Sequence, residues 1–474
     1  MNTVLFVVSL VLLSGCAGYH PRPLSPADTA AALERRTMDS AGLKAFLEKN
    51  IRKELKPWPP RCWDFAMLNL AALYYHPDMD VARAKWGVAE AEVVSAGGRP
   101  NPRISFMGQH HSRTAGGLSP WTSGFSFDIP VETAGKRGYR IRKAEHLSDA
   151  ALLNITATAW QVRSRLRKSL QNLYSATMRE RLLNDRLAIQ QEITRLFEER
   201  LAAGESSQFE VTRVRLDANK TRLLRSEAER QKAEARAALA QALGLQVSAV
   251  NGVRISFKLF EKVPAAVGLQ EIRRQALLSR PDVLAALSEY EASQSALQFE
   301  VARQYPDIHL GPGYEWDQGD NKWSLGFSIE LPLFNRNEGP IEEAEARRKE
   351  SAAKFAALQA RILGEIDRAL AAYGEVIRKL QVADSLVSAE SSHMQAMQAR
   401  FALGASDRLD LEQAKLELSS AELSRFDALV SAEENLGRLE DAVQQPLIEW
   451  ENTPGTASSY LQPGEKIKGR RAEK

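Results

Sequence analysis

The chain carries the same pattern twice, and the second copy follows the first by about 200 residues. The clearest pair is two segments of alternating character, 121–130 and 323–332, which both begin with Trp and end with Pro. Two shorter motifs also recur: His76-Pro77-Asp78 with Arg280-Pro281-Asp282, and Arg200-Leu201-Ala202-Ala203-Gly204 with Arg400-Phe401-Ala402-Leu403-Gly404. Such a regular duplication indicates one structural unit used twice, which restricts the folds open to this chain.

Each unit contains a long tract that predicts an unbroken helix. Residues 139–203 contain neither Gly nor Pro, and their apolar positions recur at coiled-coil spacings, so we expect a helix about 100 Å long. The matching tract is 340–403, and returning helices are expected over 205–243 and 405–443. The first return is short, so we expect 281–304 to extend it. A tall hollow bundle and a single antiparallel coiled coil both fit these lengths.

Four segments change to an alternation of apolar and polar residues, which predicts strands at about 102–111, 120–130, 306–316 and 322–332. Phe127 and Phe327 lie on apolar faces, whereas Ser126 and Ser328 lie on polar ones. The strand length and the Trp residues near the ends favour a transmembrane β-barrel, although a soluble sheet would alternate in the same way. Four strands leave open edges that lipid does not tolerate, so the chain must oligomerise; two copies would give eight strands and three would give twelve.

The N-terminus indicates export. Residues 4–13 are uncharged and apolar, which fits the core of a signal peptide, and they lead into Leu13-Ser14-Gly15-Cys16. This tetrapeptide resembles the lipobox of bacterial lipoproteins, which implies a signal peptide over 1–15 and covalent lipid on Cys16; a plain signal peptide is the alternative. We expect a Pro-rich extended arm over 16–63, a first repeat over 64–247, a linker over 248–270, a second repeat over 271–446 and a disordered tail over 447–474.

Other functions have little support in the sequence. The net charge of +3 is too small to indicate a nucleic-acid partner, and no other stretch is apolar enough for a transmembrane helix. There is no nucleophile–base pair, phosphate loop or ligand-spaced set of Cys and His, so we expect no enzyme activity, no bound metal and no cofactor besides the lipid. Cys62 is expected to be buried or half-buried, and His110 and His111 to be inert loop residues.

The duplicated strand pair with long helices resembles the TolC-type outer-membrane efflux family over about residues 64–445. The resemblance implies an α+β membrane protein, a homotrimer whose chains each give four strands to a 12-stranded outer-membrane barrel above a periplasmic α-helical barrel. Residues 19–24 and 73–78 look like the lipoprotein branch that serves resistance-nodulation-division pumps. The implied function is a passive exit duct fed by a periplasmic adaptor and an inner-membrane pump, with heavy-metal cations or drugs as cargo. The alternatives are a type I protein secretion component and, in another class, a lipid-anchored periplasmic coiled-coil adaptor or scaffold.

The resemblance also implies two sets of site residues. The turns between the long helices would be where the adaptor docks, at Arg200, Leu201, Gly204, Ser207, Arg400, Phe401 and Gly404. A left-handed turn and the helix dipole explain the Gly and Arg residues without an adaptor. Glu210 and Asp410, six residues after each tip Gly, would line a constriction, where a threefold ring of acids favours cations. Three residues further on, the chain departs from the family's second acid with Arg213 and Gln413.

Overall fold

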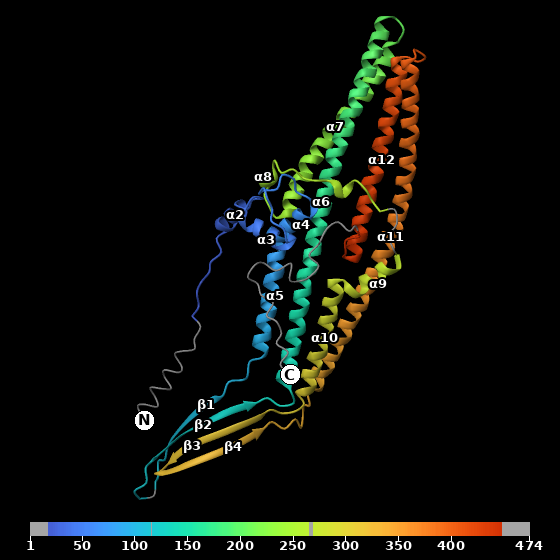
Figure 1. Cartoon of the computed structure of the whole chain (residues 1–474). Helices are drawn as coiled ribbons and strands as arrows, with labels where there is room; N and C mark the ends of the chain where they lie inside the picture. The colour runs from blue at the N-terminus through green and yellow to red at the C-terminus, as the bar shows by residue number, and fades with distance from the viewer. Residues whose placement is uncertain (1–17, 115, 265–268, 448–474) are drawn as a thin grey trace.

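The computed structural model describes residues 18–114, 116–264 and 269–447. The molecule is elongated, with a sheet at one end and two helical tips at the other (Figure 1). Helices α6 (Lys136–Ala202) and α11 (Glu338–Ala402) run from the sheet to the tips, and α7 (Gln208–Leu243) and α12 (Arg408–Val443) return. All four begin and end within three residues of the bounds expected from the sequence.

The four strands form one antiparallel sheet in the order β1-β2-β3-β4, which confirms the predicted fold class for a single chain. They are β1 (Arg103–His110), β2 (Trp121–Val131), β3 (Ile308–Asp317) and β4 (Asp320–Ile329). Pairing of β2 with β3 joins the two repeats, and β1 and β4 are left as edges. Closing such a sheet into a barrel requires strands from further copies.

Two glycines allow the strands to approach closely on the polar face of the sheet. A Cβ atom at Gly124 would lie 2.7 Å from the carbonyl oxygen of Tyr314, and one at Gly313 would lie 2.8 Å from Ser324 Oγ. Both distances are shorter than normal van der Waals contact, so only hydrogen fits at these positions.

The returning helices are extended by short helices, but in a different pairing from the expected one. Helix α5 (Pro77–Ala96) begins where α7 ends, and a Cβ at Gly244 would lie 2.6 Å from the carbonyl oxygen of Tyr75. Helix α10 (Pro281–Ala302) begins where α12 ends, and Arg280 donates to the carbonyl oxygen of Ala442. Residues 281–304 therefore extend the second repeat rather than the first. The recurring X-Pro-Asp motif marks both junctions, with Pro in the first turn of each short helix.

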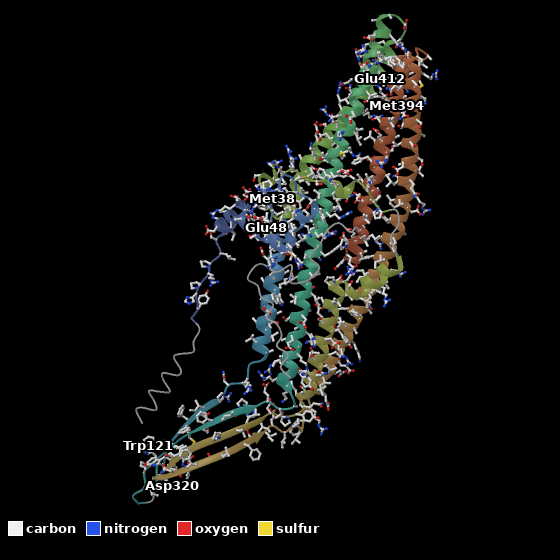
Figure 2. The ribbon with its side chains drawn as sticks, in the orientation of Figure 1. Met38, Glu48, Trp121, Asp320, Met394 and Glu412 are labelled. Carbon is white, nitrogen blue, oxygen red and sulfur yellow. The ribbon has the colours of Figure 1, made fainter. Side chains whose placement is uncertain are left out.

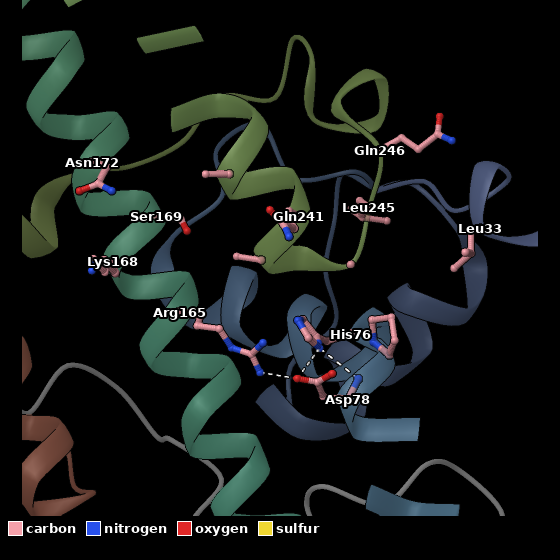
Figure 3. A pocket seen from close by; sticks show the side chains of 14 residues that line it. Leu33, His76, Asp78, Arg165, Lys168, Ser169, Asn172, Gln241, Leu245 and Gln246 are labelled. Atoms are coloured by element: carbon pink, nitrogen blue, oxygen red, sulfur yellow. Dashed lines mark hydrogen bonds and ion pairs between the residues drawn. The ribbon is translucent and has the colours of Figure 1, made fainter. Parts of the chain in front are cut away.

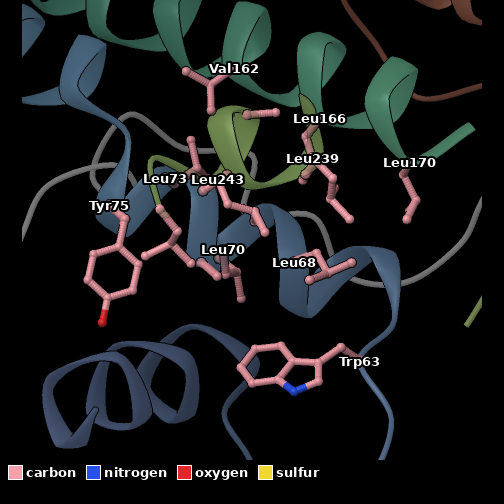
Figure 4. Packing of buried hydrophobic residues seen from close by; sticks show 14 of the residues in the cluster. Trp63, Leu68, Leu70, Leu73, Tyr75, Val162, Leu166, Leu170, Leu239 and Leu243 are labelled. Atoms are coloured by element: carbon pink, nitrogen blue, oxygen red, sulfur yellow. The ribbon is translucent and has the colours of Figure 1, made fainter. Parts of the chain in front are cut away.

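The N-terminal segment is not the extended arm that its prolines indicated. It forms α2 (Pro26–Glu34) and α3 (Ala41–Ile51) before α4 (Phe65–Tyr75). Its side chains share a core with α4, α6 and α7 (Figure 4); the buried members include Leu43, Phe46, Trp63, Leu68, Val162, Leu166 and Leu239. Burying one such large apolar side chain contributes roughly 1.5–3 kcal/mol, so this segment is part of the folded body.

The linker crosses from the first repeat to the second at mid-height. It contains α8 (Val247–Val250), a 3-10 turn (Lys258–Phe260) and the start of α9 (Leu269–Ser279). Backbone bonds tie it to the N-terminal segment, because Trp63 N–H donates to the Arg254 carbonyl at 2.9 Å and Ser256 N–H to the Trp63 carbonyl at 2.9 Å.

One further prediction is wrong, and others concern residues that the structure does not describe. Cys62 is exposed, contrary to the prediction, because its neighbour Trp63 fills the core position. The signal peptide, Cys16 and the tail from 448 onward lie outside the described residues. Among the helices that the structure describes, none combines the length and the apolar character that crossing a membrane requires.

Candidate docking tips, constriction and barrel face

Each tip has the hydrogen bonds of a helix ended by a left-handed residue. Gly204 has a φ of +78°, its N–H donates to the Leu201 carbonyl at 3.0 Å, and Glu205 N–H donates to the Arg200 carbonyl at 2.8 Å. The second tip repeats this arrangement at Gly404, with Phe401 and Arg400 as acceptors. An added Cβ would meet nothing within 4 Å at either glycine, so backbone conformation rather than space requires glycine here.

The two tips of one chain are joined by a charged pair. The guanidinium of Arg200, on the first repeat, bonds to the carboxylate of Asp407, on the second. The matching Arg400 points instead toward the Ala405 carbonyl at 3.5 Å, which is a long contact. Arg200 is thus held in place within the chain, whereas Arg400 is an exposed cation at the tip.

The two acids predicted to form a constriction have a structural role in the described chain. Glu210 Oε2 accepts a bond from Ser207 N–H at 2.8 Å, and Ser207 Oγ accepts one from Glu210 N–H at 3.2 Å. Asp410 and Asp407 form the same reciprocal pair, at 3.3 Å and 2.8 Å. These are capping boxes, which satisfy free N–H groups at the start of a helix. The sequence signal was available, because a Ser or Asp precedes each acid by three residues.

The hydrogen bonds of the caps also keep carboxylates charged. The N–H of Ser207 is the main cause that lowers the pKa of Glu210, and the N–H of Asp410 is the main cause that lowers the pKa of Asp407. Both groups are therefore anionic throughout the neutral range. The tips carry fixed negative charge beside the exposed cation Arg400.

A buried acid near the tips was missed from the sequence. Glu412 is buried on α12 and lies 2.8 Å from Lys415 Nζ (Figure 2). Arg408, at the start of α12, lies 3.2 Å from Glu192 Oε1 and 3.6 Å from Glu412 Oε1. Gln413, the residue after Glu412, is exposed, and the sequence around it did not indicate that Glu412 is buried.

The sheet has an apolar face and a polar face, as predicted. Ile129, Leu310 and Phe327 lie opposite one another on three strands, which places Phe127 and Phe327 on one face. The polar face holds its own contacts, because Asp317 accepts from Thr122 Oγ1 at 2.5 Å and His309 Nδ1 lies 2.7 Å from Asp128 Oδ1. Throughout the part of the chain that the structure describes, no three His, Cys, Asp or Glu side chains group as a metal site would require.

A cavity of about 740 Å³ lies at the junction of α7 and α5 (Figure 3). This junction is remote from the tips and from the sheet (Figure 1). Arg165 Nη2 lies 2.5 Å from Asp78 Oδ2, and Asp78 N–H donates to His76 Nδ1 at 3.2 Å. The bond from Arg165 is the main cause that lowers the pKa of Asp78, whereas burial chiefly lowers that of His76. These polar groups hold the start of α5 against α6, so we assign them to the junction.

Comparison with known proteins identifies matching sequences for both repeats. The family model described as "Outer membrane efflux protein" matches residues 70–245 and 272–443. The cobalt-zinc-cadmium resistance protein CzcC of Cupriavidus metallidurans is 26% identical over 260 residues, which is 54% of this chain and 59% of CzcC. The probable outer membrane lipoprotein SilC of Salmonella typhimurium is 21% identical over 91% of this chain and 96% of its own length.

Solved structures match the fold over nearly their whole length. The outer-membrane channel OprN superimposes with a TM-score of 0.65 and 19% identity, over 90% of this chain and 98% of OprN. The outer membrane protein VceC of Vibrio cholerae gives a TM-score of 0.64 and 19% identity, over 81% of this chain and 97% of VceC. At such identity the likeness concerns the arrangement of strands and helices.

Proposed function

Because the chain belongs to the outer membrane efflux protein family, we propose that it is the exit duct of a tripartite efflux system. In this proposal it conducts substrates passively from a periplasmic adaptor and an inner-membrane pump to the exterior. The observation that carries the proposal is the incomplete sheet, whose exposed apolar face suits lipid, at the end of helices about 100 Å long. A coiled-coil adaptor would have no use for such a sheet.

The proposed duct is a homotrimer, and two surfaces support it. The edges β1 and β4 offer unpaired backbone groups that a neighbouring copy can satisfy, so three chains would give twelve strands. Helix α7 also exposes an apolar stripe at seven-residue spacing, with Phe209 76%, Leu216 55% and Leu223 73% exposed. The position that matches Phe209 on α12, Leu409, is only 6% exposed. We infer that the α7 stripe packs on α11 of the next copy, near the exposed Val382 and Leu386.

The proposed cargo is heavy-metal cations. CzcC is named for resistance to cobalt, zinc and cadmium, and the Alcaligenes protein NccC, 23% identical, for nickel, cobalt and cadmium. A ring of Asp410 carboxylates, one from each copy, would attract such cations, and the adaptor would dock on the tips around Arg200 and Arg400. The resistance-nodulation-division type of pump and the lipid on Cys16 complete the proposal. The names of CzcC and NccC favour metal efflux over the alternative of protein secretion.

Metal tolerance tests this function. A strain that keeps its pump and adaptor but lacks this gene should accumulate zinc, cobalt or cadmium, and the native chain should restore export. Leu223→Asp should fail to restore it, because the charge disrupts packing between copies. Arg222→Asp, at a position that matches the exposed Glu422 of α12, is the control and should restore export. Equal cellular metal with and without the native gene would refute the proposed cargo.

A further inference from the structure

Four charged side chains are buried between the middle of α6 and the C-terminal part of α12. Arg163 and Arg167 of α6 are 8% and 4% exposed, and Glu433 and Glu440 of α12 are 1% and 3% exposed. Arg167 Nη2 lies 2.8 Å from Glu433 Oε2 and its Nε lies 3.4 Å from Glu440 Oε2. Arg163 Nη1 lies 3.2 Å from Glu440 Oε2. This charged cluster therefore joins the first repeat to the second across the α6–α12 seam.

The surroundings of the cluster fit one position of Arg167. A Cβ atom at Gly437 would lie 2.3 Å from Arg167 Nη1, so the glycine leaves the space in which the guanidinium lies. Arg167 Nη1 also donates to the Glu433 carbonyl at 3.1 Å. On another side, Phe260 of the linker covers the group, with its ring centroid 5.7 Å from Arg167 Cζ. Phe260 in turn stacks on Tyr174 at 5.7 Å, which closes the seam to water on that side.

The cluster is not a requirement of this helical architecture, because the duplicated unit lacks it. The positions about 200 residues away are Leu363 and Asp367 on α11, and Ala233 and Ala240 on α7. The surfaces that we propose to meet between copies therefore carry three small or apolar residues and one exposed acid, Asp367, where the seam within one chain carries four buried charges. Burying charge costs free energy of desolvation. Charge that is buried at only one of the two types of seam therefore indicates a specific role.

The charges in the cluster are incompletely satisfied: Arg163 Nε lacks a hydrogen-bond partner among the described residues, and so does one carboxylate oxygen. Among the described residues, Glu433 Oε1 has no hydrogen-bond partner. Burial raises the pKa of Glu433 to about 7, opposed by Arg167 and assisted by the nearby Glu440. Glu433 helps to raise the pKa of Tyr174 of α6 and of Tyr373 of α11, but burial is the main cause for each phenol, and both are neutral near pH 7. Glu261 of the linker acts on Tyr174. Glu433 is therefore a carboxyl whose charge changes near neutral pH, and burial also raises the pKa of Asp441, which Glu440 and Arg163 influence as well.

We propose that the α6–α12 seam is a proton-sensitive latch, in which Glu433 takes up a proton when the seam closes and releases it when the seam opens to water. An ordinary Glu in water titrates near pH 4.3, well below the buried Glu433. The closed seam then binds a proton more tightly than the open one, so its stability falls as pH rises from about 4.3 to about 7 and is constant above that. Mild acid thus favours the closed seam.

The latch has a consequence at the tips. Helices α6 and α12 carry Arg200 and Asp407 at their far ends, and these two residues hold the tips of one chain together. Opening the seam would let the two helices separate below that pair. The latch goes beyond the proposed efflux function, because it depends on this chain's seam and not on the cargo.

Hydrogen exchange in the full-length oligomer in detergent tests the latch. Peptides from 160–175 and 428–442 report on the seam, and peptides of α5 and α10 in the same sample cancel the intrinsic effect of pH. We expect exchange of the seam, relative to these references, to rise about tenfold from pH 6 to pH 8 in the native protein. Glu433→Gln should remove the rise because the amide cannot ionise, and Glu434→Gln, at the exposed neighbour, should keep it.

Three outcomes would overturn the proposal, and the third concerns Glu433→Asp. One is relative exchange that is the same at pH 6 and pH 8 in the native protein, a measurement that needs no variant. The second is a rise that Glu434→Gln removes as fully as Glu433→Gln does. Glu433→Asp retains a carboxyl at the same place and should keep a rise with pH, so a flat profile in a folded Glu433→Asp oligomer also counts against the latch.

Discussion

The side chain of Asp410 has two roles, one in capping α12 and one proposed for the channel. Its carboxylate accepts the bond from Asp407 N–H that caps α12, and its charge would also face a narrow lumen in a trimer. The family resemblance drew attention to the charge, whereas the capping box was readable from the spacing of Asp407 and Asp410 alone. The two roles separate experimentally, because an amide keeps the acceptor but loses the charge.

We expect Asp410→Asn to raise single-channel conductance in planar bilayers and to weaken block by multivalent cations. Three carboxylates around one axis repel each other and hold cations, and the amide removes both effects. Asp410→Ala should do the same and also lose about 1 kcal/mol of capping stability. Asp407→Asn is the control, since it changes the pair with Arg200 and should alter adaptor coupling more than conductance. If Asp410→Asn changes neither conductance nor block, the constriction lies elsewhere.

Lipidation is a second prediction at the residue scale. Cys16→Ser should abolish incorporation of labelled palmitate, because the thiol is the acceptor in the lipobox reading. The chain supplies its own control, since Cys62 is its only other cysteine and is exposed. Cys62→Ser should therefore leave the label unchanged. Persistent labelling of Cys16→Ser would contradict the assignment. Efflux itself can survive, because the proposed barrel would also hold the protein in the membrane.

The strands carry a prediction about which face meets lipid. An Arg on a lipid-facing position near mid-bilayer costs roughly 2–4 kcal/mol, and much less on a face toward water. Phe327→Arg should therefore reduce the amount of assembled trimer, measured by size-exclusion chromatography of extracted membranes. Ser328→Arg, one residue along the same strand and on the polar face, should assemble normally. Equal losses in both variants would indicate a sheet that does not face lipid.

At the element scale, local pattern predicted the long helices and the strands because period and length are properties of the segment itself. The predicted partner of α10 was wrong because the pairing depends on a distant contact, from Arg280 to the Ala442 carbonyl, that no local pattern reveals. The N-terminal segment was also misjudged. Its prolines indicated an extended chain. Helix α3 is short, so its pattern did not predict the burial of Leu43 and Phe46, which become buried only against α4. The charged cluster escaped notice for the same reason, since its members come from both repeats.

At the scale of the whole molecule, a single chain is an incomplete unit. The two repeats share one sheet and one charged seam, yet the edges β1 and β4 and the apolar stripe of α7 are left uncovered within the chain. Sequence arithmetic allowed two copies or three, and the family resemblance favoured three. The fold of a single chain fixes which surfaces must be covered, whereas the number of copies needs its own measurement.

Native mass spectrometry of the detergent-extracted, full-length protein tests this claim most directly. We predict an assembly of three copies for the native chain, and dissociated chains for Leu223→Asp, because the charge lies in the stripe that meets the next copy. Arg222→Asp should retain three copies. A native protein that is monomeric, or that assembles with two or four copies, would contradict the account of a duct built from twelve strands.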